Sequence, residues 1–535
     1  MRIDELIDGY LEWMFDESPT VASFHGADGR DDRLPDLSAD GWARRDDAQD
    51  DWAAKFGALR DDELTPDQQI DRDLVQSELR GAAITRDWVR WRRDPDSYVA
   101  AGLMGVFSLF TRRLHPEPEL VSAAVARLDG VERLLDEGRA NLDPSLASPL
   151  LVRRALGQCR AAIVYCRDLL PPEVEDDRGR ALVAEAGRAA AAAYESFASF
   201  LEDLAEKATG DWALGEDRYS ALLRDKELLP DDAASLCERG REQHAALEEE
   251  MRALCRDAWG DDDWRTRLDT VNGDRPMTPD EMRDGYEHWT EAARAFLHEH
   301  ELVSFPEGES CTVEPSPPFQ RPVLAVASYF QPPAMRSGLE GRFNVPYPPD
   351  GTSAEDLAER LADNSFANMA TTSVHEAYPG HHWHFAWLQA AAPPLRRLIT
   401  TSYFVEGWAL YAERMMREQG FFSDPAQDLC HLAARIFRAA RIVADTSLHC
   451  GDMTFDEAVD YMHANSPLTM AVARVEVTRY CAWPTQAASY LTGSLEIERL
   501  RERWLAEGGD LRGFHDRLAG SGAMPIQLAG RSLFG

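Results

Sequence analysis

The sequence contains very little lysine and no long apolar run. Its only lysines are Lys55, Lys207 and Lys226, so arginine carries nearly all of the positive charge. No stretch approaches the roughly 20 uncharged apolar residues that a membrane-spanning helix requires. The N-terminal segment mixes charged and apolar side chains and lacks the uninterrupted apolar core of a signal peptide. These absences argue against a membrane-spanning protein and against secretion.

Closely spaced cysteine pairs are also missing. The eight cysteines are scattered, and no two of them form a C-x-x-C pair. In a chain of 535 residues without a secretion signal, such cysteines are expected to be reduced and mostly buried. We therefore predict a cytoplasmic protein.

Negative charge dominates, with a formal net charge of −37 at pH 7. An acidic surface repels phosphate groups, so neither nucleic acid nor an anionic membrane is expected as a partner. The apolar fraction of 44% is close to that of globular proteins and predicts a substantial buried core. The length allows two or three domains, or one large helical body with two lobes.

The organisation of the chain changes near residue 303. Residues 1–302 are predicted to form a helical N-terminal lobe, because apolar residues recur at three- and four-residue steps, for example over 120–142 and 180–208. Residues 303–535 are predicted to form a second, metal-binding lobe, although one integrated unit is the alternative. The start of the second lobe is rich in proline and glycine and contains two strand-like runs, 323–330 and 341–348. The predicted fold is mostly α, with a small β hairpin or sheet next to a metal-binding helix pair.

A cluster of histidines carries the clearest chemical pattern. Zinc hydrolases often place two histidine ligands four residues apart on a helix, as H-E-x-x-H, with the glutamate as general base. Here His375 and Glu376 are followed by His381, and removal of Pro379-Gly380 would leave H-E-A-Y-H. The pattern therefore predicts a metal site in which His375 and His381 are ligands.

The two inserted residues decide which histidine faces His375. On an undistorted helix His381 would lie roughly 240° away, and His382 would be the better match. Proline lacks the N–H that continues a helix, and glycine accepts unusual dihedral angles, so Pro379-Gly380 predicts a bulge that returns His381 to the face of His375. His382 is the alternative ligand.

A third ligand is predicted on the next helical segment. Glu406 lies among apolar residues and precedes Gly407, and a buried glutamate requires a cation. Glu413, seven residues later on the same face, is either an alternative ligand or an acceptor for a ligand histidine. Two imidazoles and a carboxylate predict one Zn²⁺ ion, although other divalent metals also suit these donors.

These residues resemble a large, mainly bacterial family that is catalogued as a domain of unknown function, is marked by H-E-x-x-P-G-H and is similar to the gluzincin metallopeptidases. In that class one helix brings two histidines and a base, and the next brings a glutamate. The resemblance spans roughly residues 320–505. One departure is Thr485, where the family pattern usually has a glycine, which puts a turn in doubt. The matching segments are 375–376, 379–381, 406–409, 411–413, 441–446, 448–449, 479–480, Pro484, 486–487 and Tyr490.

Three further residues are candidates for catalysis. Glu376 would accept a proton from the attacking water and pass it to the leaving amine. A donor to the developing oxyanion is also needed, and Tyr490 is the first candidate and His449 the second. Either could instead be structural. Asp445, four residues before His449, is placed to orient its ring.

Two residues are candidates for substrate binding. The planar guanidinium of Arg479 suits a substrate carboxylate, but a structural ion pair is the competing role. The strand around Asn344 could pair with an extended peptide, or could belong to a purely structural hairpin.

The sequence as a whole predicts a zinc-dependent metallopeptidase that cleaves short peptides. One alternative is a zinc hydrolase of a non-peptide amide or ester. The other is a non-catalytic helical binding protein whose metal is structural. A fourth protein ligand, such as His382 or Glu413, would close the site and favour that last alternative.

Overall fold

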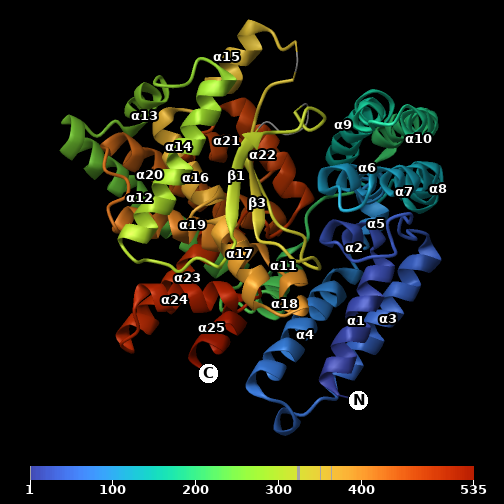
Figure 1. Ribbon diagram of the computed structural model, residues 1–535, viewed down its shortest axis with the longest axis horizontal. Helices are drawn as coiled ribbons and strands as arrows, with labels where there is room; N and C mark the ends of the chain where they lie inside the picture. The colour runs from blue at the N-terminus through green and yellow to red at the C-terminus, as the bar shows by residue number, and fades with distance from the viewer. Residues whose placement is uncertain (1, 322–325, 350, 363) are drawn as a thin grey trace. The chain divides into compact units, whose positions relative to one another are not determined.

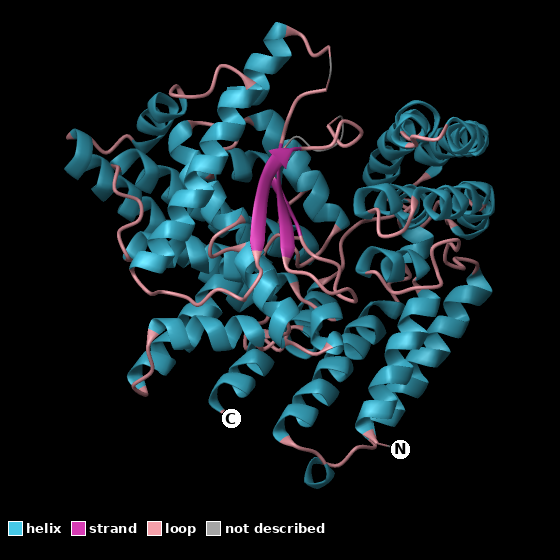
Figure 2. Ribbon diagram, in the orientation of Figure 1, coloured by secondary structure: helices cyan, strands magenta, loops and turns pink. Residues whose placement is uncertain are grey.

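The computed structural model describes residues 2–321, 326–349, 351–362 and 364–535. Helices account for 71% of the chain and strands for 3%. Figure 2 shows the strands as one small sheet among helices. The prediction of a mostly α protein with a small β element is confirmed.

The chain divides into two compact units, of which the first ends at Leu214 and also takes in Pro333–Ser337. This first unit is entirely helical in its described residues, and its longest helix is α10, which follows the Pro171-Pro172 break (Figure 1). Its helices are α1 Ile3–Glu17, α2 Pro19–His25, α3 Ala39–Gly57, α4 Pro66–Arg86, α5 Arg90–Arg93, α6 Asp96–Arg112, α7 Glu117–Asp129, α8 Val131–Asn141, α9 Pro149–Val164 and α10 Asp177–Lys207.

The second unit comprises Gly215–Pro332 and Gly338–Gly535 and contains the sheet. Its helices are α11 Glu216–Ala221, α12 Ala233–Trp259, α13 Trp264–Asn272, α14 Pro279–Glu299, α15 Ala354–Ala362, α16 Phe366–Glu376, α17 His381–Ala391, α18 Pro394–Leu398, α19 Ser402–Glu418, α20 Pro425–Cys450, α21 Phe455–Asn465, α22 Met470–Ala482, α23 Ser489–Ala506, α24 Leu511–Gly520 and α25 Ile526–Phe534. Its strands are β1 Ser310–Pro315, β2 Ser328–Phe330 and β3 Glu340–Val345.

The division between the units differs from the boundary expected at residue 302. That boundary followed a change in composition, whereas the helices after Leu214 group with the second unit because α12 packs along α20. Gly240 on α12 allows this approach, since a Cβ atom there would lie 2.8 Å from the side chain of Ile442. Four residues later on α12, His244 Nε2 lies 2.8 Å from the carbonyl oxygen of Asn465, at the end of α21.

The sheet has the strand order β1-β3-β2. β3 pairs in parallel with β1, from Ser310 opposite Glu340, and antiparallel with β2, from Ser328 opposite Asn344. The ring of Phe343 packs against Tyr286 of α14, with 5.2 Å between ring centroids. β3 is therefore the central strand, and β2 is an edge strand.

The hairpin expected from the two strand-like runs corresponds to β2 and β3. Residues 323–325 of the first run lie outside the described residues, and the end of that run forms β2. The sequence did not predict β1, because the segment lies in a proline- and glycine-rich stretch and ends at Pro315. β1 matters for the site, because it pairs with the edge of β3 that β2 leaves open.

Close contact between α19 and α23 fixes the neighbourhood of Glu406. A Cβ atom at Gly407 would lie 2.6 Å from the backbone of Gly493, and one at Gly493 would lie 1.8 Å from the carbonyl oxygen of Tyr403. Only two glycines allow the backbones to approach this closely. Because Gly407 follows Glu406 and Gly493 lies three residues after Tyr490, the crossing brings these two polar side chains to one region.

The expectations for the cysteines and for membrane-spanning helices can be compared with the described residues. All eight cysteines are free, and six of them are buried. Within the same residues, no helix combines the length and apolar character needed to cross a membrane.

Candidate metal centre

The chain breaks between the two histidines of the motif. α16 ends at Glu376 and α17 begins at His381, so the expected bulge within one helix is instead a turn between two helices. The peptide bond between Tyr378 and Pro379 is cis. A Cβ atom at Gly380 would lie 2.0 Å from the carbonyl oxygen of His375, so the turn requires glycine at this position.

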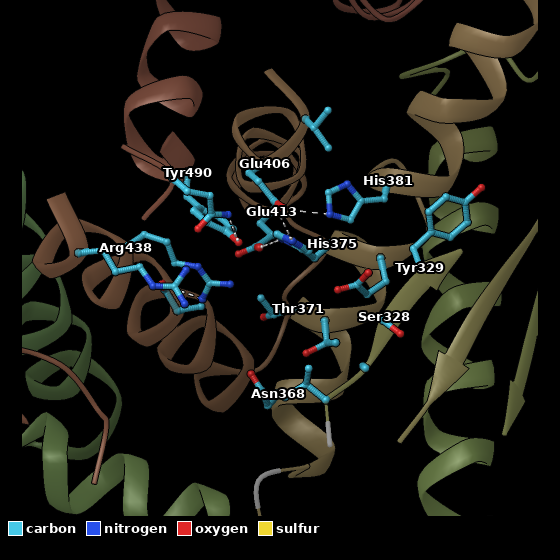
Figure 3. A pocket seen from close by; sticks show the side chains of 18 of the residues that line it. Ser328, Tyr329, Asn368, Thr371, His375, His381, Glu406, Glu413, Arg438 and Tyr490 are labelled. Carbon is cyan, nitrogen blue, oxygen red and sulfur yellow. Dashed lines mark hydrogen bonds and ion pairs between the residues drawn. The ribbon is translucent and has the colours of Figure 1, made fainter. Parts of the chain in front are cut away.

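This turn places His375 and His381 near the third predicted ligand, Glu406 of α19. The Nε2 atoms of His375 and His381 lie 3.7 Å and 3.5 Å from Oε2 of Glu406. All three donor atoms lie within 4.8 Å of one another, and Figure 3 shows the side chains pointing toward one another. A tetrahedral ion with bonds of about 2.0–2.1 Å separates its ligand atoms by about 3.4 Å. The donor types and their spacing therefore fit a zinc ion.

The carboxylate of Glu413 lies on the other side of the His375 ring. His375 Nδ1 lies 2.7 Å from Glu413 Oε1, and Nδ1 of the buried His431 lies 3.4 Å from Glu413 Oε2. Glu413 is 1% exposed. This is the arrangement by which a carboxylate fixes the orientation of a ligand histidine.

The electrostatics of the centre favour positive charge. Burial lowers the pKa of His375, but hydrogen bonds to Glu406 and Glu413 outweigh it and raise that pKa to about 10. Burial acts to raise the pKa of both glutamates. Hydrogen bonds with the histidines prevail and hold the pKa of Glu406 far below its usual value and that of Glu413 at about 2. Two ionised carboxylates beside two imidazoles form a suitable environment for a divalent cation.

The alternative ligand His382 is engaged elsewhere. Its Nε2 lies 2.9 Å from Glu309 Oε2, and its Nδ1 lies 3.1 Å from the hydroxyl of Tyr329. Glu309 also accepts hydrogen bonds from Tyr378 at 2.8 Å and Arg294 at 2.7 Å. Both ring nitrogens of His382 therefore have partners away from the cluster, and this network anchors the turn between α16 and α17.

The cluster opens into a cavity of about 810 Å³. Figure 3 shows polar side chains around it. Thr371 lies one turn before His375 on α16, and its buried hydroxyl has no hydrogen-bond partner among the described residues. The lining also includes Ser328 and Tyr329 of β2, Asn368 of α16, Glu376, Arg438 and Arg441 of α20, Glu476 and Arg479 of α22, Gln486 and Tyr490.

Glu376 lies at this cavity, next to the cluster. Burial raises the pKa of Glu376, while His375 and His381 act in the opposite direction and Glu406 adds to the increase. A backbone hydrogen bond from Tyr329 also reaches the carboxylate. Glu376 is thus a carboxylate that is more basic than usual and lies beside the three donors.

Tyr490, a predicted catalytic residue, also lines the cavity. It lies near the start of α23, and its hydroxyl is 3.3 Å from Nε2 of Gln486. Burial, together with the charge of Glu406, raises its pKa. The side chain points toward the same space as Glu406 and Arg438 (Figure 3).

The second oxyanion candidate, His449, does not reach the cavity. It is fully buried on α20, where Nε2 lies 3.0 Å from the carbonyl oxygen of Tyr480 and the ring stacks on Tyr219. Asp445 is 3.8 Å from Nε2 of His449 and instead accepts hydrogen bonds from the Tyr219 hydroxyl at 2.5 Å and the Thr485 N–H at 3.0 Å. His449 lies near the end of α20, where these contacts hold its ring in the core and away from the cluster.

The two predicted substrate-binding residues have different positions. Arg479 lines the cavity but pairs with Glu476 at 2.9 Å and with Gln486, which is the structural ion pair considered as its competing role. Asn344 is 5% exposed and does not line the cavity. It lies on the central strand β3, whose two edges are already paired, so the expectation that this strand accepts a peptide does not hold. The edge strand beside the cavity is β2.

Several residues of the site were not predicted from the sequence. Arg438 is one of them, although it lies one turn before the recognised Arg441 on α20 and so shares its face. His431 and Glu309 were also missed. Only the fold brings them to Glu413 and His382, so no local pattern could have identified them.

The departure at Thr485 has a structural consequence. Thr485 has a φ of +71°, in the left-handed region that favours glycine. The turn that was in doubt is therefore formed, with a β-branched residue at a position better suited to glycine.

The fold and the centre together define a large helical protein with a buried cluster of two histidines and one glutamate. A family described as bacterial protein of unknown function (DUF885) matches residues 19–533. The chain therefore belongs to this family. A comparison with curated proteins gave no match.

Two solved structures are similar over nearly the whole chain. One is described as "a putative lipoprotein of unknown function from Shewanella oneidensis", with 21% identity, a TM-score of 0.83 and 99% of each chain covered. The other is described as "the putative lipoprotein from Colwellia psychrerythraea", with 19% identity and a TM-score of 0.81, and the match covers 99% of this chain and 98% of that one. At these identities the likeness shows a shared fold.

The prediction of a cytoplasmic protein is contradicted by these neighbours. Both are described as lipoproteins, a class attached to membranes outside the cytoplasm. The prediction rested on the scattered cysteines and on the mixed charged and apolar character of the N-terminal segment. Neither feature determines a compartment, so we withdraw it.

Proposed function

We propose that this protein is a zinc-dependent hydrolase and that it cleaves amide bonds in short peptides. The observation that carries the proposal is the convergence of His375, His381 and Glu406 on one point, with Glu376 beside them and a cavity in front. A volume of about 810 Å³ is within the range of small-molecule sites and suits a ligand of a few residues.

His375, His381 and Glu406 would hold the ion, and Glu413 would keep the ring of His375 in its orientation. When bound, zinc supplies Lewis acidity that polarises a carbonyl group and lowers the pKa of water toward about 7. His382 and Glu413 have partners of their own, and no fourth histidine, cysteine, aspartate or glutamate joins the cluster among the described residues. An open position favours a catalytic centre over a structural one.

Glu376 is the proposed general base. Its carboxylate accepts the proton of the attacking water and then donates it to the departing amine nitrogen. Its position supports the role, because the carboxylate follows the proposed ligand His375 directly and lines the cavity in front of the cluster.

Tyr490 is the proposed donor to the oxyanion. Its hydroxyl lies at the cavity wall, and the α19–α23 crossing fixes it near Glu406. Such a donor stabilises the negative charge that develops on the carbonyl oxygen. Gln486, 3.3 Å from the hydroxyl, helps to hold it in place.

The arrangement also supports the resemblance to gluzincin metallopeptidases. Two helices, α16 and α17, supply the histidines and the base, and α19 supplies the glutamate. Here the two histidines belong to separate helices joined by Ala377–Gly380, so the chain differs at this point from the single helix that brings both histidines in the gluzincin class.

Metal dependence tests the proposal. The purified protein is analysed for zinc and incubated with a mixed library of short peptides, before and after removal of metal with a chelator. We expect about one zinc per chain, cleavage that disappears with the metal, and recovery when zinc is restored. A zinc-loaded protein that cleaves no peptide would refute the peptidase function. A folded protein that binds no divalent metal would refute the centre itself.

A further inference from the structure

The wall formed by α20 and α22 brings three arginines to the cavity of an otherwise acidic protein. Arg441 and Arg479 share one carboxylate, because both donate to Oε2 of Glu476, at 2.7 Å and 2.9 Å. The remaining arginine of the lining is Arg438. Three guanidinium groups and a single adjoining carboxylate leave this wall positively charged.

Arg438 is the member of this group that forms no ion pair at contact distance with a described residue, although the charges of Glu413 and Glu406 also act on it. One of its terminal nitrogens donates to the carbonyl oxygen of Ala434 at 3.0 Å, within its own helix. Its Nε atom is buried without a hydrogen-bond partner, and no carboxylate among the described residues forms an ion pair with it. In Figure 3 the side chain extends into the cavity that also contains His375 and Glu406.

A partly buried guanidinium with no carboxylate in direct contact and an unsatisfied Nε is unfavourable in a folded protein, so an anionic ligand is its natural complement. Arg438 and Arg441 both lie near the ring of Tyr490, with guanidinium carbons 5.8 Å and 4.8 Å from its centroid. The cationic wall is thus next to the proposed oxyanion donor.

We propose that Arg438 binds a free carboxylate group of the substrate. This inference rests on the proposed hydrolase function and narrows its substrates to short peptides, or other acylated amino acids, with a free carboxyl terminus near the cleaved amide. The planar guanidinium can donate two parallel hydrogen bonds to a carboxylate, which a neutral amide cannot accept in the same way. Arg479, in contrast, already has its carboxylate partner.

Binding, rather than turnover, provides the test. Titration calorimetry measures the affinity for N-acetyl-alanyl-alanine and for the same molecule with an amide in place of its carboxylate. The titrations use the metal-loaded Glu376→Gln protein, so that hydrolysis does not interfere. Arg438→Gln and Arg438→Lys are added to this background. Arg474→Gln is the matched control, because Arg474 is an exposed arginine on α22 that pairs with Asp456 outside the cavity.

We expect the acid to bind roughly 10- to 100-fold more tightly than the amide. Arg438→Gln should abolish this preference, Arg438→Lys should retain part of it, and Arg474→Gln should leave it intact. Circular dichroism and zinc content establish that each variant is folded and loaded. If Arg438→Gln does not fold, the test uses the Arg438→Lys protein. An unchanged preference of that variant for the acid over the amide would refute a role for the guanidinium fork.

The inference is overturned if acid and amide bind equally, if neither binds, or if the preference survives in Arg438→Gln. That last result would assign the carboxylate to the metal or to another arginine. Failure of the hydrolase function is distinguishable, because it would leave the acid bound selectively by a protein that does not cleave peptides.

Discussion

The Glu413 carboxylate lies 2.7 Å from Nδ1 of His375, on the side of the ring opposite to Nε2, which faces Glu406. The pair is buried, so the hydrogen bond fixes both the tautomer and the orientation of the imidazole. With Nδ1 donating to Glu413, Nε2 is directed at the cluster, where it would be free to bind a metal ion after losing its proton. The proposed metal centre is therefore supported by a residue that need not touch the metal.

Replacing Glu413 tests this support. In Glu413→Gln the ligands are retained but the charged acceptor is lost, so we expect zinc affinity to fall about 10- to 100-fold. Competition with a chromogenic chelator measures the affinity. Glu418→Gln is the control, because Glu418 lies on the same helix and pairs with Arg414 and Arg501. Equal affinities in the two variants would show that Glu413 does not support the centre.

The choice between neighbouring histidines provides a second test. We expect His381→Ala to lose zinc, because one of three ligands is removed. His382→Gln should keep about one zinc per folded chain, because His382 contacts Glu309 and Tyr329 instead of the cluster. Metal analysis of the folded fraction measures both. If His382→Gln lost its zinc and His381→Ala kept it, the ligand would be His382 and not His381.

The composition of the cluster could be predicted because the donor types and the proline–glycine insertion are local features. The sequence identified His375, His381 and Glu406, and the structure brings them within 4.8 Å of one another. The form of the turn could not be predicted, because Pro379 and Gly380 are compatible both with a bulge within one helix and with a break between two helices.

Predictions that depended on tertiary pairing were less successful. Asn344 was expected on an accessible strand, but β1 pairs with β3 and makes it central. His449 has a suitable residue type, yet its place at the end of α20 directs it into the core. The importance of Arg438 lies in its unsatisfied Nε and in the lack of an ion pair with any described residue, which only a folded chain reveals.

Thr485 offers a test of backbone strain. A residue with a side chain in the left-handed region loses about 1–2 kcal/mol, whereas glycine adds about 0.5–1 kcal/mol of conformational entropy cost on folding. Thr485→Gly should therefore raise the free energy of unfolding by about 0.5–1 kcal/mol, as measured by denaturant titration. Thr478→Gly, within α22, should lower it. If Thr485→Gly lowered the free energy of unfolding, the threonine side chain would contribute more stability than its backbone strain costs.

Asp445 is expected to make stability depend on pH. Burial raises its pKa from 3.8 to about 7, against hydrogen bonds from Tyr219 and Thr485 that act to lower it. Between these two values the folded state holds a proton that the unfolded state releases. The contribution of Asp445 to stability is therefore complete below about pH 4 and is lost as the pH rises through 7.

Asp445→Asn isolates this contribution. Both hydrogen bonds reach Oδ2, so an asparagine oxygen can accept both and mimic the protonated acid. The difference in unfolding free energy between the variant and the wild type should increase from pH 4 to pH 7, with a slope of at most about 1.4 kcal/mol per pH unit. Denaturant titrations across this range measure it, and a difference that does not change with pH would contradict the assignment.

The most direct test of a catalytic metal centre is a comparison of the wild type with Glu376→Gln. Zinc content and cleavage of the mixed short-peptide library are measured on both proteins. Because Glu376 is the proposed base and not a ligand, the variant should keep its zinc and lose cleavage by a factor of roughly 10² to 10⁴. If Glu376→Gln keeps its zinc and cleaves peptides at the wild-type rate, Glu376 is not the base and the proposed mechanism is wrong.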